Sequence, residues 1–251
     1  MDSYEKFAKI YDRLIYEDID YKSWAKFILD LNLKLDINKE NYLDIGCGTG
    51  NMAAEICSSF KNCFCVDISE DMLMIAQEKF REKRLMANFI CQDMRELKLN
   101  KKFDLITCCL DCTNYLAEEG DLDTYLNKIY ELLKDDGIYI FDINSEYKLR
   151  EVMGENIFSY NEEDVVYLWE NRTVENIEEM YLTFFIQSHG STYERFEEIH
   201  RERIYSQEEI TASVEKNNMK VLYKFQNYTF GNVDSKTQRI TYVVSKKGKD
   251  E

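Results

Sequence analysis

Proline is absent from this chain of 251 residues, and positive charge is in short supply. Lys and Arg number 32 against 48 Asp and Glu, which gives a net charge of −16. Because nucleic-acid backbones and anionic membrane surfaces attract basic faces, this balance argues against either as a partner. No apolar run approaches the roughly 20 residues that a membrane-spanning helix needs. A small molecule is the expected partner, and the missing proline itself indicates no function.

Histidine is also scarce, with two residues, whereas cysteine occurs eight times, always between Cys47 and Cys112. The short spacings of Cys63 with Cys65 and of Cys109 with Cys112 would form a zinc site only if the pairs faced each other with further ligands in support. Most of these cysteines stand in apolar runs, and no signal peptide precedes them. We therefore expect reduced, buried thiols, no metal and a cytoplasmic location.

Three glycines at alternate positions are the strongest pattern in the sequence. An apolar run over 42–45 predicts a buried strand, and residues 52–56 predict the opening of a helix. Between them, Gly46, Gly48 and Gly50 predict a tight turn. Glycine suits a turn in which a ligand lies against bare backbone amides, because a Cβ would collide with that ligand. The pattern predicts a nucleotide-cofactor site, with an ordinary glycine-rich turn as the alternative.

Two neighbouring residues indicate which cofactor. A dinucleotide loop has its third glycine three residues after the second, and here that residue is Asn51. Asp44, just ahead of the turn, would repel a diphosphate and attract an ammonium or sulfonium group. The run over 44–50 resembles motif I of the class I S-adenosylmethionine-dependent methyltransferases. That resemblance implies that Asp44 orients the methionyl amino group and that the turn lies under the methionine and ribose. Its expected cofactor contacts are Gly46, Cys47, Gly48 and Gly50.

A carboxylate also ends the next predicted strand, over 62–67. Asp67 lies 21 positions after the first glycine, where nucleotide-binding units place an acid on the ribose hydroxyls. A helix N-terminal charge is the alternative, since residues 69–71 already have the pattern of a cap and an acidic first turn. With Asp67 on the ribose, Ile68 and Met72 would flank the adenine ring.

The third predicted strand, over 87–92, is followed by Asp93 and Met94. The family resemblance implies that Asp93 accepts a hydrogen bond from the adenine amine and that the backbone amide of Met94 donates to the ring. A solvated aspartate in a turn is the competing interpretation.

The fourth predicted strand spans 103–110 and leads into a polar loop. Ligands of parallel α/β sheets bind beyond the carboxyl ends of the strands, so this loop should face the transferred methyl group. Leu110 is an expected cofactor contact and Asp111 a candidate catalytic residue. Asn114 and Tyr115 are candidate substrate-binding residues.

Two amphipathic helices, over 4–15 and 21–31, are predicted before the first strand. Their aromatic residues could simply be core. Tyr11, Tyr21 and Trp24 also resemble the N-terminal cap of small-molecule methyltransferases, which excludes water from a reactive sulfonium. We take Tyr11 as a candidate catalytic residue and the other two as candidate substrate contacts.

The pattern changes over 144–205, where the segments 164–170, 180–187 and 193–205 predict an antiparallel β insertion. This insertion holds 14 acidic and 6 basic residues, a net charge of −8. A lid over the acceptor is the expected role, and a structural appendage or a dimerisation sheet is the alternative. His200 lies on a strand face with Phe196, Glu198 and Glu202. It is a candidate catalytic base, although a surface histidine beside glutamates would fit as well.

The order of elements predicts a doubly wound, Rossmann-like α/β fold. A helix over 122–133, a turn over 134–137 and a strand over 138–141 follow the fourth strand, and a capping box at 206–209 restarts a helix. Two closing strands over 219–225 and 239–244 complete seven. The resemblance implies the strand order 3-2-1-4-5-7-6 with the seventh antiparallel. We expect residues 1–143 and 206–251 to form the cofactor-binding core with its cap.

The expected reaction is an in-line displacement that moves the methyl group of S-adenosylmethionine to a small-molecule acceptor. Three other classes stay open. These are a non-catalytic S-adenosylmethionine-binding regulator, an NAD-dependent oxidoreductase and an acidic interaction module. The acceptor and the oligomeric state are left undetermined by the sequence.

Overall fold

The computed structural model describes residues 19–248 together with Asp12 and Leu14. Seven strands form one sheet in the order β10-β11-β5-β4-β1-β2-β3, in which only the pairings of β11 are antiparallel. This confirms the predicted doubly wound fold and its strand order. The strands are β1 (Asn41–Ile45), β2 (Asn62–Asp67), β3 (Asn88–Cys91), β4 (Phe103–Cys108), β5 (Leu133–Asn144), β10 (Met219–Gln226) and β11 (Arg239–Lys246).

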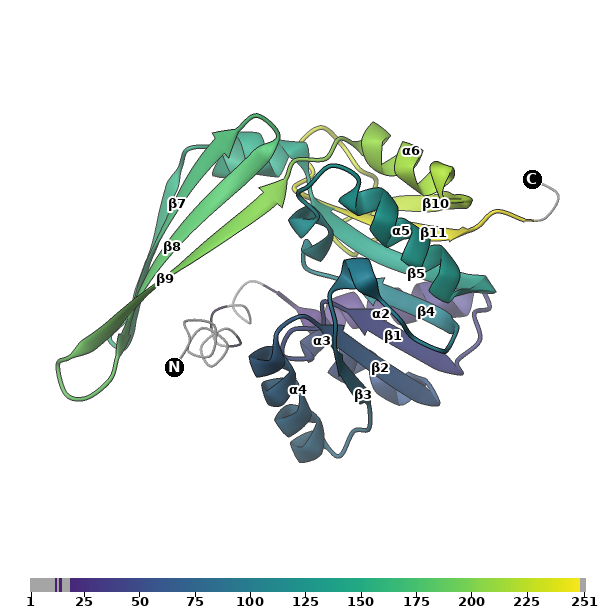
Figure 1. Ribbon diagram of the computed structural model, residues 1–251, viewed down its shortest axis with the longest axis horizontal. Coiled ribbons are helices and arrows are strands. Elements are labelled where there is room, and N and C mark those ends of the chain that lie inside the picture. The colour runs from purple at the N-terminus through teal and green to yellow at the C-terminus, as the bar shows by residue number, and fades with distance from the viewer. Residues whose placement is uncertain (1–11, 13, 15–18, 249–251) are drawn as a thin grey trace.

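Helices cover both faces of this sheet (Figure 1) because its central strands are apolar on both sides. Tyr42 and Leu43 show the alternation, since they are fully buried in different hydrophobic clusters. Side chains on successive strand positions point to opposite faces, so each cluster takes every second residue. One face carries α2 (Tyr21–Lys34), α3 (Asn51–Ile56) and α4 (Glu70–Lys83), and the other carries α5 (Asp121–Leu132) and α6 (Gln207–Lys216).

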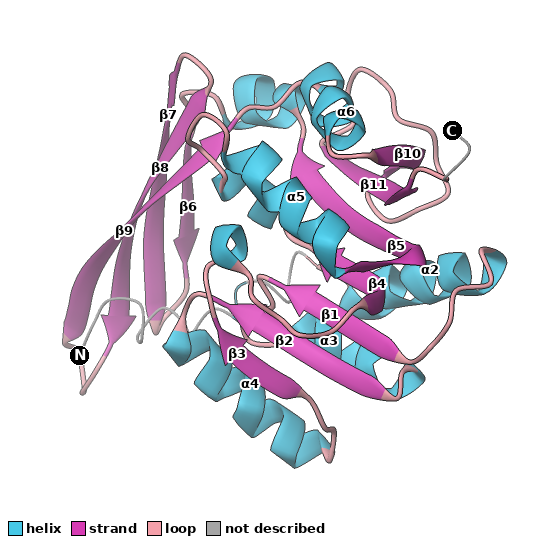
Figure 2. Cartoon of the chain, turned by 45° about the vertical axis from the view of Figure 1, so that its right-hand side comes forward, coloured by secondary structure: helices cyan, strands magenta, loops and turns pink. Residues whose placement is uncertain are grey.

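The insertion forms a second sheet of antiparallel strands in the order β6-β7-β8-β9, as predicted in kind. Figure 2 shows it standing opposite the arrowheads of β1 and β2. A π-helical segment, η4 (Lys148–Met153), joins it to β5. Neither η4 nor β6 was predicted, because their residues follow neither a helical nor an alternating pattern. The strands are β6 (Ile157–Asn161), β7 (Val165–Val174), β8 (Ile177–Gln187) and β9 (Tyr193–Arg203).

One local prediction was wrong. The turn expected over 134–137 belongs to β5, which already begins at Leu133. Gly137 explains why this strand needs a glycine: a Cβ there would lie 2.8 Å from the carbonyl oxygen of Phe103 on the neighbouring strand. The residue marks a close approach between β4 and β5, where a turn was expected.

Part of the predicted N-terminal cap is outside the described structure. The helix expected over 4–15 and the candidate Tyr11 both fall there, with the exception of Asp12 and Leu14. The second predicted helix is α2, which Asp20 caps by accepting a hydrogen bond from the backbone of Ser23. Within residues 19–248, no helix combines the length and apolar character that crossing a bilayer requires.

Candidate functional site

A cavity of about 990 Å³ lies at the carboxyl ends of β1, β2 and β4. One wall is the glycine turn with the ends of these strands, and the opposite wall is formed by β7, β8 and β9 (Figure 2). It therefore collects residues from both sheets and from α2. The predicted site residues that line it are Tyr21, Trp24, Asp44, Gly46, Cys47, Gly48, Asp67, Ile68, Met72, Asp93, Met94, Leu110, Asp111, Tyr115 and His200.

The glycine turn is built for a ligand at one position and for packing at the others. Gly46 and Gly48 both have positive φ angles, +65° and +52°. A Cβ on Gly46 would lie 2.7 Å from the Sγ atom of Cys112, so packing excludes it, whereas a Cβ on Gly48 would meet nothing within 4 Å. Gly50 ends the turn as the N-cap of α3 and does not line the cavity. The space above Gly48 is thus open to a bound molecule.

Asp44 ends β1 as a buried carboxyl group, 2% exposed, at the edge of the cavity. Its Oδ1 accepts a hydrogen bond of 2.6 Å from the hydroxyl of Thr107, while Oδ2 has no hydrogen-bond partner among residues 19–248. Burial raises the pKa of Asp44 to about 7. A cation bound beside Oδ2 would satisfy this atom and stabilise the ionised form.

Asp67 ends β2 and contacts the glycine turn directly. Its Oδ2 accepts a hydrogen bond of 2.7 Å from the backbone amide of Gly48, and its Oδ1 accepts one of 2.9 Å from Ser69. Burial raises its pKa despite these bonds. The helix cap of α4 is supplied by Ser69, whose hydroxyl accepts from Met72. Asp67 therefore retains acceptor capacity toward the cavity, because each carboxylate oxygen can accept two hydrogen bonds.

The adenine-binding candidates form a rim on the same side. Ile68 is 65% exposed, whereas Met72 is buried, and both line the cavity. Asp93 forms an ion pair with Arg95, which also reaches Asp121 at 3.3 Å. The hydrogen bond from Arg95 lowers the pKa of Asp93 and keeps it ionised. Arg95 was not predicted as a partner.

The loop after β4 has an unusual backbone. Leu110 and Asp111 both have positive φ angles, 61° and 51°, although neither is glycine. Each such residue costs on the order of 1–3 kcal/mol. The carboxylate of Asp142, at the end of β5, accepts hydrogen bonds from both backbone amides, at 2.8 and 2.9 Å. A buried strand-end carboxylate thus holds the loop in place.

Asp111 itself is bound by an arginine. The Nη2 atom of Arg239 lies 2.6 Å from Oδ1 of Asp111, and the same guanidinium pairs with Asp142. Burial would raise the pKa of Asp111, but the charges of Arg239 and Lys148 outweigh burial and lower it. A carboxylate held ionised in this way is a weak proton acceptor, so its place in the site is structural and electrostatic.

Tyr115, at the end of the 3-10 helix η3 (Cys112–Tyr115), meets His200 of β9 at the cavity. The hydroxyl of Tyr115 lies 3.0 Å from Nδ1 of His200, and Nε2 of His200 lies 3.7 Å from the carboxylate of Glu198. The imidazole is 13% exposed, which contradicts the alternative of a surface histidine. Burial lowers its pKa, so the ring is neutral near pH 7 and can accept a proton.

Asn114 lies elsewhere. It is fully buried and does not line the cavity. Its amide donates to the carbonyl oxygens of Asn144 and Arg203 and accepts from the amide of Asn144. The residue therefore fastens the start of the insertion to its end, and the structure argues against its predicted contact with a substrate.

The aromatic residues of α2 close the remaining side. Trp24 stacks on Tyr228 with ring centroids 4.2 Å apart, and the guanidinium of Arg239 lies 5.5 Å from the Trp24 ring. Asp12, from the segment before α2, forms an ion pair of 2.7 Å with Lys79 and accepts a hydrogen bond from Thr49 on the glycine turn. Asp12 is thus held beside the glycine turn.

Sequence reasoning missed many lining or supporting residues, and four of them matter most for the charge and shape of the site. Lys148, Trp169 and Arg239 line the cavity from elements far apart in the chain, and Asp142 supports the loop after β4. Asp142 carried a usable signal, because it ends a predicted strand as Asp67 does. The other three carried none, since each became relevant only when the second sheet and β11 were placed.

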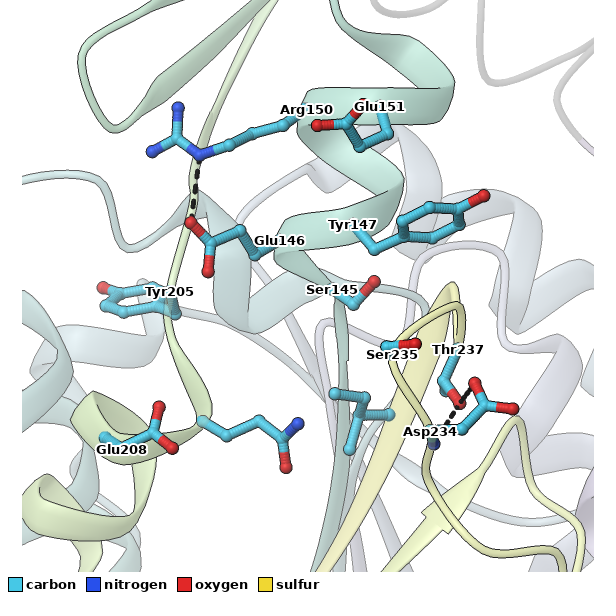
Figure 3. Close-up of a pocket in the computed structure, with 12 residues that line it drawn as sticks. Ser145, Glu146, Tyr147, Arg150, Glu151, Tyr205, Glu208, Asp234, Ser235 and Thr237 are labelled. Carbon is cyan, nitrogen blue, oxygen red and sulfur yellow. Dashed lines mark hydrogen bonds and ion pairs between the residues drawn. The ribbon is translucent and has the colours of Figure 1, made fainter.

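A second hollow, of about 360 Å³, lies between η4, α6 and the loop before β11 (Figure 3). Its charged lining is mainly acidic, and Glu146 binds the Nε atom of Arg150 at 3.1 Å. The other end of that guanidinium donates to the carbonyl oxygen of Glu175 and to Asn176. This hollow shares no lining residue with the larger cavity. Because the glycine turn, Asp44 and Asp67 all line the larger cavity, that cavity is the candidate site.

Sequence comparison identifies proteins related to this chain. Residues 43–137 match the profile of the methyltransferase domain family. A protein of Geobacillus sp. (strain WCH70) with a provisional methyltransferase name is 33% identical over 97% of this chain and 100% of its own length. A second such protein, from Bacillus subtilis (strain 168), is 32% identical over 82% of each chain.

Solved structures agree with the sequence relatives. The crystal structure of an S-adenosylmethionine-dependent methyltransferase from Clostridium acetobutylicum is 43% identical, with a TM-score of 0.92 over 98% of this chain and 100% of that chain. An amino pentose methyltransferase from Micromonospora echinaspora, solved with S-adenosylmethionine bound, has a TM-score of 0.77 over 95% and 97%, but at 16% identity it shows the fold alone. The chain therefore belongs to the class I S-adenosylmethionine-dependent methyltransferases, and S-adenosylmethionine is its cofactor.

Proposed function

We propose that this methyltransferase acts on a small molecule bound between α2 and the antiparallel sheet. The observation that carries the proposal is a single cavity with the glycine turn at one end and β7, β8 and β9 at the other. A cofactor and an acceptor can therefore lie in line within one continuous cavity, which is what displacement at a sulfonium methyl needs. The cofactor supplies the activated methyl group, and the protein aligns the reactants and excludes water.

The residues at the turn fit S-adenosylmethionine. Asp44 offers an unpartnered buried oxygen to the methionyl ammonium, and Gly48 leaves room above its backbone. Asp67 is placed to accept from the ribose hydroxyls. The remaining proposed cofactor contacts are Gly46, Cys47, Ile68, Met72, Asp93, Met94 and Leu110, whereas Gly50 lies outside the cavity and packs against α4.

On the acceptor side, Tyr115 and His200 form a proton-accepting pair. A nucleophile that must lose a proton before attack would give it to the neutral imidazole, directly or through the Tyr115 hydroxyl. Tyr21 and Trp24 would close the acceptor chamber from the side of α2. The net charge of −16 further disfavours nucleic acid and membrane lipid as acceptors.

The rival classes fit less well. A regulator that only binds the cofactor would need no chamber beyond it, whereas this cavity continues to the second sheet. An NAD-dependent enzyme would place a diphosphate near Asp44. Calorimetry tests the NAD-dependent class, because we expect binding of S-adenosylmethionine and S-adenosylhomocysteine and none of NAD. Release of S-adenosylhomocysteine in a turnover assay separates the enzyme from a regulator that only binds the cofactor.

The catalytic proposal is tested with the chain's two histidines. A metabolite screen for release of S-adenosylhomocysteine identifies an acceptor, and His200→Ala should then lower kcat by about 100-fold, as loss of a general base does. Cofactor affinity should stay unchanged. Because protonation disables the base, wild-type kcat should fall as pH drops through the lowered pKa of His200, and the variant should lose this dependence.

His189→Ala is the matched control, since His189 is exposed in the turn between β8 and β9. It should behave as wild type. Unchanged kcat and an unchanged pH profile in His200→Ala would refute the role of His200 as catalytic base. The proposal that the protein is a small-molecule methyltransferase would not be affected.

A further inference from the structure

The acceptor end of the cavity is unusual for so acidic a protein, because it gathers cations. Lys148, Lys236 and Arg239 line it. Arg239 is already paired with Asp111 and Asp142. Neither lysine forms an ion pair within 4 Å in the described part of the chain, and the charges of Asp111 and Asp142 act on Lys148 from farther away.

Lys148 is the clearest case. Its Nζ donates a hydrogen bond of 2.8 Å to Oδ1 of Asn144 and, among residues 19–248 with Asp12 and Leu14, has no carboxylate within 4 Å. The other end of the same amide donates to Glu202 at 2.8 Å. Asn144 thus bridges the ammonium of Lys148 and the carboxyl group of Glu202.

Glu202 is not a charged partner for Lys148. It is 2% exposed, and burial raises its pKa well above the usual range, with the Asp111 charge adding to the effect. The direct partner of the Lys148 ammonium is therefore the neutral amide of Asn144, while the charges of Asp111 and Asp142 act on it from beyond ion-pair distance. Burial also lowers the pKa of Lys148, and a bound anion would stabilise its charged form.

A second hydrogen-bond donor stands on the same side. Trp169 of β7 lines the cavity, and its buried Nε1 has no hydrogen-bond partner in the described part of the chain. Trp169 packs against the cluster that contains Met153 and Met180, so η4, which begins at Lys148, and the second sheet form one wall. This wall offers an apolar surface beside the Lys148 ammonium and is suited to an acceptor that carries oxygen atoms on an apolar body.

We propose that the acceptor carries a carboxylate on an apolar or aromatic body, with the carboxylate bound by Lys148 and the body lying against Trp169, Met180 and Leu182. This inference rests on the proposed function. The carboxylate serves as the handle that positions the molecule, and a separate nucleophilic atom faces Tyr115. An ammonium is a strong partner for a carboxylate where water is excluded.

Matched acid and amide pairs test the proposal on the enzyme loaded with S-adenosylhomocysteine. The probes are phenylacetate, 3-phenylpropionate and octanoate, each beside its amide and the corresponding amine, with binding measured by saturation-transfer NMR and calorimetry. At least one acid should bind about tenfold or more tighter than its amide and amine. Lys148→Met should abolish that preference and Lys148→Arg should retain it.

Lys224→Met is the control, because Lys224 lies outside the cavity. It should keep the preference. The proposed contact between Lys148 and a carboxylate would be overturned by any of four results. These are equal binding of acids and amides, tighter binding of amines, no binding of any acid, and an undiminished preference in Lys148→Met. Cofactor affinity is measured on every variant. Loss of the proposed function would appear separately, as absent methyl transfer in the metabolite screen with wild-type enzyme.

Discussion

Asp44 is a carboxyl group whose charge depends on its ligand. Its pKa is about 7 in the folded protein against 3.8 for an ordinary aspartate. Between these values the folded chain holds a proton that the unfolded chain has lost. Asp44 therefore makes the free energy of unfolding fall as pH rises through this window. A bound ammonium reverses the preference by favouring the ionised form.

We expect S-adenosylmethionine binding to tighten as pH rises from about 5.5 to about 7, by up to roughly tenfold per pH unit, with release of a proton. Asp44→Asn should weaken binding and remove this dependence. Calorimetry in buffers of different ionisation enthalpy measures both. Asp30→Asn, on the exposed side of α2, is the control. A pH dependence that survives in Asp44→Asn would assign it to another group.

Asp67 should matter for affinity in a different way. Asp67→Ala removes charge-assisted hydrogen bonds to the ribose, worth on the order of 1.5–3 kcal/mol, so we expect cofactor affinity to fall by roughly 10- to 150-fold. Asp71→Ala, in the first turn of α4, should bind as wild type does. Circular dichroism checks the fold. Unchanged affinity with an intact fold would disprove the ribose contact.

The residues that sequence predicted well are local ones. The roles of Asp44 and Asp67 could be predicted because each lies at the end of a buried strand. The strand order then brings those strand ends together. The role of Arg239 could not be predicted, since its hydrogen bond to Asp111 joins residues 128 positions apart in the sequence. Asn114 shows the converse, because a polar residue in a short turn does not reveal which way its side chain points.

At the level of elements, the insertion is the predicted determinant of acceptor use. Deleting residues 158–198 removes most of the second sheet but none of the cofactor contacts. We expect calorimetry to show retained cofactor binding and the assay to show no methyl transfer to the acceptor. Replacing only the turn at 188–192 with glycines should leave turnover intact. A full rate in the large deletion would show that this sheet is not a lid.

Elements were predictable where one pattern covers a whole segment. The strands of the core and the three long strands of the insertion follow their apolar patterns. The start of β5 was missed because Lys134, Asp135 and Asp136 have the composition of a turn. The pairing with β4 shifts register between Leu133 and Ile138, so residues 134–137 form an irregular part of the strand, in which Gly137 fits against Phe103. Tertiary contacts of this kind are absent from any local window.

For the molecule as a whole, we expect eight reduced thiols and no metal. All eight cysteines are free, and no group of three or more metal-binding side chains occurs in the described ranges. Cys91 is exposed and should react first with a thiol reagent, and the other seven should titrate on unfolding. Stoichiometric zinc by elemental analysis, or fewer than eight thiols in unfolded protein prepared without reductant, would contradict this.

The amide of Asn114 has a consequence for how such enzymes diversify. It binds the backbone where the insertion leaves the core, at Asn144, and where it returns, at Arg203. The intervening chain is therefore a loop whose two ends are held together by Asn114. The entropic cost of closing a loop changes only slowly with its length. Descendants of one ancestor can lengthen, shorten or exchange this loop and so change what is methylated, while the cofactor site in the seven-stranded core keeps its shape.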